Sequence, residues 1–294
     1  MLRSSNRDSV PAEGSPVLEE ILRGNRFSFG ENWTYFLRVL TEERIREAGK
    51  SLQNMLGVER LDGSSVLDIG CGSGLFSLAA RRLGARVHSF DYDPQSTACA
   101  QQLKERFFPS DSAWTIEAGS ILDPDYTGRL GRFDLVYSWG VLHHTGSVWE
   151  ALDQAMRPVA SGGRLWIALY NYQPTLTSWW TLVKRAYQCV PAALRPLYVA
   201  PFFLYVTLAG LVADLLRGDD PRRRYRGLGR RGMSLWHDVV DWVGGWPFQA
   251  TRPADVVAFA KARGLEVVTV KTVGRRHGCN EFLFARPPRL ENRA

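Results

Sequence analysis

The stretch SSVLDIGCGSGLFSLAA, residues 64–80, decides the fold of this chain. An apolar strand pattern ends in Asp68 and runs into Gly70, Gly72 and Gly74, and a helical pattern follows directly. Glycine at these positions lets the backbone turn sharply and approach a ligand with no Cβ in the way. The acid comes before the glycines, which suits a cationic ligand better than a pyrophosphate. The segment therefore predicts a ligand site at the carboxyl end of a strand.

Short apolar runs alternate with helical patterns on both sides of this segment. Strands are expected at 64–70, 85–91, 113–119, 132–139, 162–171, 265–273 and 280–286. Helices are expected at 75–84, 94–108, 147–159 and 251–264. Strand–helix alternation requires crossover connections, so we predict an α/β, Rossmann-like sheet of seven mostly parallel strands with helices on both faces.

Further segments are expected around this core. Ile45, Ala48, Leu52 and Met55 recur at spacings of three and four, which predicts helix before the first strand. The expected segments are a disordered lead-in at 1–16, an N-terminal helical cap at 17–60, a cofactor-binding core at 61–171, a helical, apolar and arginine-rich lid insert at 172–250, a closing helix and two strands at 251–286, and a tail at 287–294.

Five segments of the core form a characteristic series. They are VLDIGCGSG (66–74), SFDYDP (89–94), EAGSILD (117–123), FDLVYSWGVLHH (133–144) and RPVASGGRLWIALYN (157–171). Together they resemble the class I S-adenosylmethionine-dependent methyltransferases, over about residues 60–171 and 251–286. Ser161 departs from the usual fifth-strand signature, whereas Gly162 and Gly163 keep it. Within the superfamily the chain is most similar to the ubiquinone-biosynthesis type and related small-molecule O-methyltransferases.

The resemblance implies S-adenosylmethionine as the cofactor and S-adenosylhomocysteine as the product. Asp68 would stabilise the ammonium end of the methionine moiety, and Asp91 would accept hydrogen bonds from both ribose hydroxyls. The other implied cofactor contacts are the backbone of Gly70, Cys71, Gly72 and Gly74, then Tyr92, Ser120 and Ile121 around the adenine, and Ser138 and Trp139 beside the methionine moiety.

The segment NRFSFGENWTYF (25–36) is aromatic and polar, which is unusual for a helix that only supports a sheet. N-terminal segments of the resembled superfamily often close over the cofactor, so Trp33 and Tyr35 are candidates for a lid. The alternative is that both rings fill gaps in the core.

Methyl transfer to a hydroxyl needs a group that removes the hydroxyl proton, and histidine suits this task at neutral pH. His143 and His144 follow the fourth strand, and His237 and Asp241 lie four residues apart on one helical face. We prefer His237 oriented by Asp241 as the base. The alternatives are a structural role for the LHH segment and a surface ion pair for His237. No clear set of metal ligands appears, so no metal is expected.

The insert contains LYVAPFFLYVTLAGLVADLL at 197–216, long and apolar enough to span a bilayer. A single span would separate the last two strands from the sheet that they complete, so we do not expect one. Pro201 and Asp214 favour an interrupted or interfacial helix. We expect a lid with peripheral membrane contact, in which Phe202, Phe203, Leu204 and Tyr205 line an acceptor pocket. The alternative is that the run docks on a membrane surface, with the six following arginines attracted to anionic headgroups.

The formal charge of +7 is concentrated in RRRYRGLGRR, Arg222–Arg231, which contains six arginines and no acid. We expect this segment to contact an anionic membrane surface; the alternative is a solvated loop. A general nucleic-acid binder usually spreads its charge over a face, so nucleic acid is not expected as a partner. The four cysteines form no CxxC pair and residues 1–16 lack an export signal. We therefore expect a cytoplasmic enzyme, peripheral on the inner face of a membrane.

The sequence thus predicts an S-adenosylmethionine-dependent methyltransferase that O-methylates a small or lipid-like hydroxyl acceptor. Two alternatives remain at this point. One is an RNA methyltransferase, which the arginine segment would serve, and the other is a protein that binds S-adenosylmethionine without transferring its methyl group.

Overall fold

A computed structural model of the chain describes residues 16–220, 235–275 and 278–288. The expected lead-in, the Arg222–Arg231 segment and most of the tail lie outside the described residues. The expectations for these segments therefore stay predictions.

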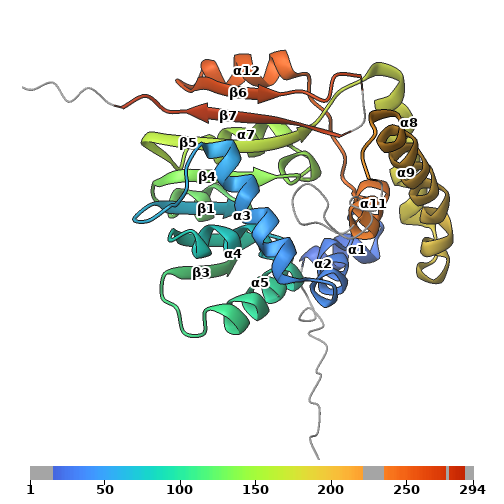
Figure 1. The fold of residues 1–294 in the computed structure, drawn as a ribbon, viewed down its shortest axis with the longest axis horizontal. Coiled ribbons are helices and arrows are strands. Elements are labelled where there is room, and N and C mark those ends of the chain that lie inside the picture. The colour runs from blue at the N-terminus through green and yellow to red at the C-terminus, as the bar shows by residue number, and fades with distance from the viewer. Residues whose placement is uncertain (1–15, 221–234, 276–277, 289–294) are drawn as a thin grey trace, which may run out of the picture.

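Seven strands form one sheet in the order β3-β2-β1-β4-β5-β7-β6 (Figure 1). Their bounds are β1 Ser65–Ile69, β2 Arg86–Asp91, β3 Trp114–Ala118, β4 Phe133–Trp139, β5 Val159–Tyr170, β6 Glu266–Lys271 and β7 Cys279–Ala285. Only β7 runs antiparallel to its two neighbours. The predicted α/β class and the mostly parallel seven-stranded sheet are confirmed.

Two apolar clusters cover the two faces of this sheet. Val66 faces the cluster under α3 Glu42–Leu56, α4 Leu75–Arg82 and α5 Pro94–Phe107. Its neighbour Leu67 faces the cluster under α7 Val148–Met156 and α12 Pro253–Lys261. Successive strand residues point to opposite faces, so strands covered on both faces read as nearly continuous apolar runs. The chain order reverses between β1 and β4, and that switch point is where α/β sheets bind ligands.

The N-terminal cap consists of three helices: α1 Pro16–Leu22, α2 Phe29–Arg38 and α3. Thr41 begins α3 because its hydroxyl accepts a hydrogen bond from the Arg44 amide, and Gly57 ends it in a left-handed conformation. Helices α1 and α2 of the cap and the helices of the insert lie beyond the carboxyl ends of the parallel strands, whereas α3 lies against one face of the sheet (Figure 1).

The insert contributes α8 Pro174–Cys189, the short 3-10 turn Ala192–Leu194, α9 Arg195–Arg217 and α11 Leu235–Gly244. A third apolar cluster joins these helices to Phe27 before α2. The two ends of the insert meet at the sheet: Asn171 forms a parallel bridge with Thr251, and the Tyr172 amide donates to the Thr251 carbonyl at 3.0 Å.

Two expectations about the apolar run change. Of the two readings of Pro201, an interrupted or an interfacial helix, the interrupted one is wrong, because helix α9 is continuous through Pro201 and loses the one backbone hydrogen bond that this proline cannot donate. The run also does not line the cavity described below. Phe202 and Phe203 pack against the third cluster, while Leu204 and Tyr205 are more than half exposed. One side of α9 packs against the third cluster, and the other side is exposed.

Within the described residues, one helical stretch is long and apolar enough to cross a membrane by length and composition, namely residues 192–217, in which an 18-residue window has a mean hydropathy of 2.0. Its surroundings argue against a single crossing. The following helix α11 packs against both α8 and α9, and β7 and β6 join the sheet beside β5. The segments before and after α9 therefore lie on the same side of any bilayer.

Candidate active site

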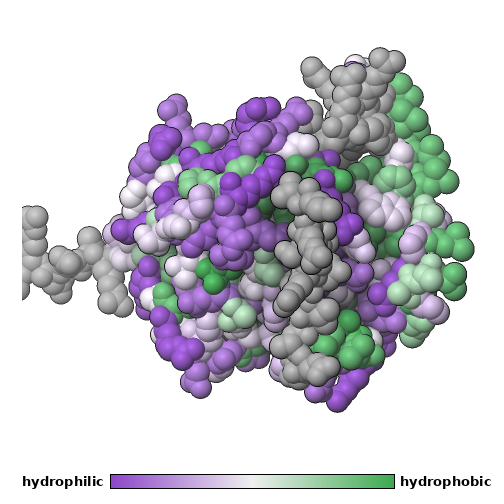
Figure 2. All heavy atoms as spheres, turned by 90° about the horizontal axis from the view of Figure 1, so that it is seen from below, coloured by the Kyte–Doolittle hydropathy of each residue, from purple (hydrophilic) through white to green (hydrophobic). Residues whose placement is uncertain are grey.

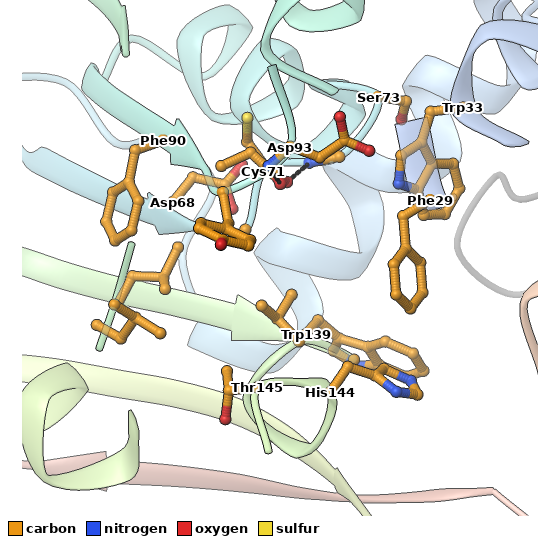
Figure 3. Close-up of a pocket in the computed structure, with 18 of the residues that line it drawn as sticks. Phe29, Trp33, Asp68, Cys71, Ser73, Phe90, Asp93, Trp139, His144 and Thr145 are labelled. Atoms are coloured by element: carbon orange, nitrogen blue, oxygen red, sulfur yellow. Dashed lines mark hydrogen bonds between the residues drawn. The ribbon is translucent and has the colours of Figure 1, made fainter. Parts of the chain in front are cut away.

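A cavity of about 400 Å³ lies at the carboxyl ends of β1, β2 and β4, under α2 and α11. This volume is in the range of small-molecule sites. Figure 3 shows Phe29 of α2 pointing toward the wall that carries Trp139 and His144, while Trp33 lies beside Ser73 of the glycine turn. Ten of the predicted cofactor residues line it: Trp33, Asp68, Gly70, Cys71, Gly72, Asp91, Tyr92, Ser120, Ile121 and Trp139.

Asp68 ends a chain of buried hydrogen bonds whose directions are fixed. The Trp114 indole can only donate, so Ser89 Oγ accepts from Trp114 Nε1 at 2.9 Å. Ser77 Oγ donates to Asp68 Oδ2 at 2.5 Å, which leaves Ser89 as the donor in the 2.7 Å Ser77–Ser89 bond. Burial and the nearby Asp91 carboxylate raise the pKa of Asp68 to about 7, against the effect of the Ser77 hydroxyl. The chain holds this carboxylate rigidly in an environment that disfavours its charge.

Asp91 ties the second strand to the glycine turn. Its carboxylate accepts from the Gly72 amide through Oδ2 and from the Asp93 amide through Oδ1, each at 2.9 Å. Burial raises the pKa of Asp91 to about 6, and the two amide donors oppose this shift. Each carboxylate oxygen keeps a second lone pair, so Asp91 can still accept bonds from a ligand.

The glycine turn lies too close to the cap and to the loop after β4 for side chains to fit at Gly70 and Gly72. A Cβ on Gly72, whose φ is +54°, would lie 2.8 Å from Trp33 Nε1, and one on Gly70 would lie 2.3 Å from the Val141 side chain. Gly74 differs from the expectation: it adopts a left-handed conformation before α4, packs against Ala100 and does not line the cavity. Its role is to turn the chain from the loop into the helix.

Cys71 contributes its backbone to this wall rather than a reactive thiol. Its amide donates to the Phe90 carbonyl at 3.0 Å, and the residue is buried. Burial and the carboxylates of Asp91 and Asp68 raise the pKa of the Cys71 thiol well above its ordinary value. A thiol in this state is a poor nucleophile.

The cap is fastened to the site by contacts that the sequence analysis missed. The Gly30 amide donates to Asp93 Oδ2 at 2.8 Å, and the Arg26 guanidinium lies 4.8 Å from the Tyr92 ring centroid. Arg26 also donates to Glu20 Oε2 at 2.5 Å. An arginine beside aromatic residues is a weak signal on its own, and its partners lie far away in the sequence. Trp33 lines the cavity, whereas Tyr35 is 48% exposed and stacks with Arg38, so Tyr35 is not part of a lid.

The cavity wall is strongly acidic. Arg26 is the one lysine or arginine among the residues that line this cavity in the described chain. The carboxylates that line it are Glu20, Asp68, Asp91, Asp93, Asp238 and Asp241. Such a wall favours a cationic ligand and repels a phosphate.

His144 has a defined tautomer. Its Nδ1 lies 2.6 Å from the Pro247 carbonyl oxygen, which can only accept, so Nδ1 carries the proton and Nε2 keeps a lone pair. Burial, the Lys184 ammonium and the Arg26 guanidinium hold the pKa of His144 well below its ordinary value. Gly245 leaves room for the ring, since a Cβ there would lie 2.7 Å from Cε1 and 3.1 Å from Nε2. The cavity wall thus holds a neutral imidazole with a free acceptor nitrogen.

His143 and Ser138 do not line the cavity, contrary to expectation. The His143 ring is fully buried beside Tyr170, whose amide donates to His143 Nδ1 at 3.3 Å. Ser138 is also fully buried and donates to the Ile69 carbonyl at 3.1 Å, which links β4 to β1. Both residues support the strand ends rather than a ligand.

The preferred pair His237 and Asp241 is split between two environments. Asp241 lines the cavity, but His237 does not. The His237 ring packs edge-on against Phe36, and its carbonyl accepts from Asn32 Nδ2 at 3.1 Å. Burial and Arg44 lower the pKa of His237. The His237–Asp241 arrangement is therefore wrong, because α11 turns the imidazole toward the cap.

Lys184 is a fully buried cation that the sequence analysis did not single out. Its ammonium donates to the Trp242 carbonyl and lies 5.2 and 4.9 Å from the ring centroids of Tyr170 and Phe248. Burial lowers the pKa of Lys184 to about 7, and the Asp241 carboxylate opposes the shift. Lys184 therefore brings positive charge close to both His144 and Asp241. In the described part of the chain, no three His, Cys, Asp or Glu side chains are placed to hold a metal ion.

This sheet order, with a glycine turn and paired acids at the switch point, defines a Rossmann-like α/β protein that binds a nucleoside-containing cofactor. A family model described as a methyltransferase domain matches residues 40–200, more than half of the chain. The chain belongs to that family and is a class I S-adenosylmethionine-dependent methyltransferase. This confirms the family resemblance and the predicted cofactor.

Individual relatives match over shorter lengths. A tRNA U34 carboxymethyltransferase of Methylococcus capsulatus is 35% identical over 36% of this chain and 32% of its own. A ubiquinone biosynthesis O-methyltransferase of Methylobacterium sp. is 34% identical over 40% of this chain and 45% of its own. The chain thus spans a third to under half of these relatives. A solved magnesium protoporphyrin IX methyltransferase of Synechocystis PCC 6803 with bound SAH is 16% identical, covers 83% of this chain and 84% of its own, and has a TM-score of 0.49.

The cavity fits S-adenosylmethionine by its own chemistry. The cofactor carries two positive groups, a sulfonium and an ammonium, and a ribose with two hydroxyls. Asp68 and Asp91 are carboxylates whose raised pKa values would be relieved by a nearby cation or by hydroxyl donors. The glycine turn supplies the close backbone approach, and Trp33 covers it.

Proposed function

We propose that this methyltransferase transfers the methyl group to the oxygen of a small or lipid-like hydroxyl compound. The observation that carries the proposal is the neutral His144 imidazole, which lines the cavity and has Nδ1 committed to the Pro247 carbonyl. A base that is unprotonated at neutral pH suits the removal of a hydroxyl proton.

The chain's own residues divide into a cofactor end and an acceptor end. Asp68 and the backbone of the glycine turn would hold the methionine moiety, and Asp91 would hold the ribose hydroxyls. When bound, S-adenosylmethionine supplies a methyl group that is activated by a positively charged sulfur. Trp33 closes this end and excludes water, which strengthens the attraction between the carboxylates and the cation.

At the acceptor end, His144 Nε2 orients the hydroxyl and takes its proton as the oxygen becomes methylated. The Pro247 carbonyl keeps the ring in one orientation, so no reorganisation is needed at that moment. The positive charges of Lys184 and Arg26 disfavour the imidazolium, which promotes return of the proton to solvent.

The walls indicate what kind of acceptor fits. Phe29, Trp139 and Val141 line the cavity beside His144, and the Phe29 and His144 ring centroids are 5.0 Å apart. Aromatic and aliphatic walls favour a hydrophobic acceptor, and the carboxylates disfavour a phosphate backbone. These observations support a phenol or similar hydroxyl compound with an apolar substituent over RNA.

We place the protein in the cytoplasm at the inner face of a membrane, where a lipid-linked acceptor would be found. The six arginines at 222–231 support an anionic surface as a partner through their sequence alone.

The test is product analysis with methyl-labelled S-adenosylmethionine. The purified protein would receive alkylated phenols, the corresponding methyl ethers, alkylamines and total tRNA in separate reactions. We expect label in the phenols and none in the ethers, whose oxygen is already blocked. Label in amines or tRNA would overturn the O-methylation proposal. Tight cofactor binding with no labelled product from membrane and cytosolic extracts would favour a protein that binds the cofactor without transfer.

A further inference from the structure

The outer side of α8 and α9 carries many exposed large apolar side chains and is here called the α8–α9 face. Leu204 is 57% exposed, Leu208 50% and Leu216 84%. Figure 2 shows hydrophobic side chains gathered along the end of the molecule where α9 lies in Figure 1. The large apolar residues of the face are Trp179, Leu182, Leu194, Leu197, Leu204, Tyr205, Leu208, Val212, Leu215 and Leu216.

The spacing of these residues makes the face a stripe rather than scattered exposure. Positions 197, 201, 204, 208, 212 and 215 recur every three or four residues, which places them on one side of α9. The opposite side, with Val199 and Phe202, packs into the third apolar cluster. From Leu197 to Leu216 the one charged residue of the helix is Asp214, which is buried. The outward stripe is therefore free of charge over roughly 30 Å.

A stripe of this length and composition differs from an ordinary soluble surface. Contiguous apolar patches on monomeric proteins rarely exceed a few hundred Å², and larger ones mark docking sites. Just 17% of the apolar window within residues 192–217 is buried inside the molecule, so the helix is not a core helix. Because the chain on both sides of α9 belongs to one folded body, the helix cannot cross a bilayer once. An orientation in which α9 lies along the surface of a bilayer is compatible with the fold.

The ends of the face carry the groups expected at a membrane surface. Arg195 begins α9 and Arg217 ends it. In the sequence, six more arginines follow within residues 222–231, outnumbering Asp219 and Asp220. Trp179 and Tyr205 add amphipathic rings of the kind enriched at the boundary between headgroups and acyl chains.

We infer that the α8–α9 face docks in the interfacial layer of an anionic lipid bilayer, with α9 parallel to the membrane plane. The leucines and valine of the stripe enter the acyl boundary, and the flanking arginines remain among the headgroups. This inference concerns a surface outside the cavity, so it does not depend on the identity of the methyl acceptor.

Helix α11 connects this face to the cavity. Trp236 and Trp242 of α11 pack against Phe203 of α9 and Trp180 of α8, with ring centroids 5.3 and 4.2 Å apart. Asp241, on another side of the same helix, lines the cavity. A docked membrane would therefore lie one helix away from the acceptor end of the site.

The test uses sedimentation with phosphatidylcholine vesicles that contain phosphatidylglycerol. The variant carries Leu204→Glu, Leu208→Glu and Val212→Glu, all on the outward stripe. The matched control is Val268→Glu, which charges a side chain of similar exposure (50%) on the edge strand β6. We expect the partition coefficient of the triple variant to fall at least about a hundredfold, since each buried leucine is worth roughly a factor of ten. The control should bind like the unaltered protein.

Two further measurements keep the test decisive. Isothermal titration with S-adenosylmethionine shows whether the triple variant is folded, because the cavity residues are unchanged. Light scattering gives the oligomeric state without vesicles. Equal vesicle binding by the triple variant and the unaltered protein would overturn the inference. So would a protein that fails to bind vesicles but forms a dimer that the three glutamates dissociate, because the face would then join two copies.

Discussion

His144 Nδ1 donates a 2.6 Å hydrogen bond to the carbonyl oxygen of Pro247, a residue that follows it by more than one hundred positions. This bond assigns the proton to one ring nitrogen and leaves the other as an acceptor on the cavity wall. It also joins the loop after β4 to the end of the insert. A change in the insert can therefore alter the tautomer and orientation of His144 without touching the cofactor end of the cavity.

Replacing His144 by asparagine should separate chemistry from cofactor binding. The asparagine amide can still donate to the Pro247 carbonyl, but it has no basic nitrogen at the Nε2 position. We expect kcat to fall about 10²- to 10⁴-fold and the Kd for S-adenosylmethionine to stay within about twofold. Added imidazole should restore part of the rate. An unchanged kcat would remove His144 from the mechanism.

Lys184→Met should move the acidic limb of the pH profile of kcat. Below a pH of about 7 Lys184 is charged and disfavours protonation of His144. In the unaltered protein kcat should therefore fall only below pH 6.5. Without this ammonium the pKa of His144 rises, and activity is lost at a higher pH. Arg185→Met is the control, because it removes an exposed cation from the same helix. If neither variant shifts the pH at which kcat falls, Lys184 acts by packing alone.

Affinity for S-adenosylmethionine should depend on pH through two carboxylates. Asp68 and Asp91, with pKa values of about 7 and about 6, lose their charge as the pH falls, and a neutral carboxyl attracts the cation less. Titration calorimetry from pH 8 to pH 5 should show the affinity falling, first near pH 7. Asp91→Ala should weaken binding strongly at every pH. Constant affinity over this range would mean that neither carboxylate faces the cofactor.

Asp68→Asn should stabilise the protein while it weakens cofactor binding. The folded-state pKa of Asp68 is raised above the unfolded value near 4, so the folded state loses stability as the pH rises from about 4 to about 7. An asparagine side chain does not ionise, so this loss of stability does not occur, and its amide oxygen can still accept the hydrogen bond from the Ser77 hydroxyl. The expected gain is on the order of 4 kcal/mol at pH 8 and close to zero at pH 4, measured by urea unfolding without cofactor. A loss of stability at pH 8 would contradict the assignment.

Trp33→Ala should reduce cofactor affinity about tenfold or more, since the indole covers the glycine turn. Tyr35→Ala, two residues along the same helix, changes a half-exposed ring outside the cavity. Its Kd should stay within about twofold of the unaltered value. Similar losses in both variants would indicate a general loosening of α2 rather than a lid.

The sequence was sufficient for the sheet and for most of the cofactor end. Strand patterns and the glycine turn are local, and β1 begins and ends within one residue of its expected bounds. The roles of Asp68 and Asp91 were implied by the family resemblance of the segments that contain them, and both residues lie near the carboxyl ends of β1 and β2. Gly74 and Ser138 were misplaced because neighbouring strand and turn residues point in different directions, which a motif does not reveal.

The acceptor end was harder because long-range contacts decide it. Nothing local distinguishes His144 from His143; the difference is the Pro247 carbonyl on one side and the Tyr170 amide on the other. A single lysine in a helix normally lies in solvent, so the burial of Lys184 had no signal. The apolar run was read as a pocket wall because a helix with apolar residues all round does not show which side the protein covers.

The bridge between Asn171 and Thr251 has an evolutionary consequence. Because the insert leaves and returns at adjacent points of the sheet, about 80 residues can be exchanged with little rearrangement of the seven strands. Such a junction allows the same methyltransferase core to carry different inserts. The insert here supplies both Pro247, whose carbonyl accepts from His144, and the outer helices, so a single exchange would alter the surroundings of His144 and the outer surface together.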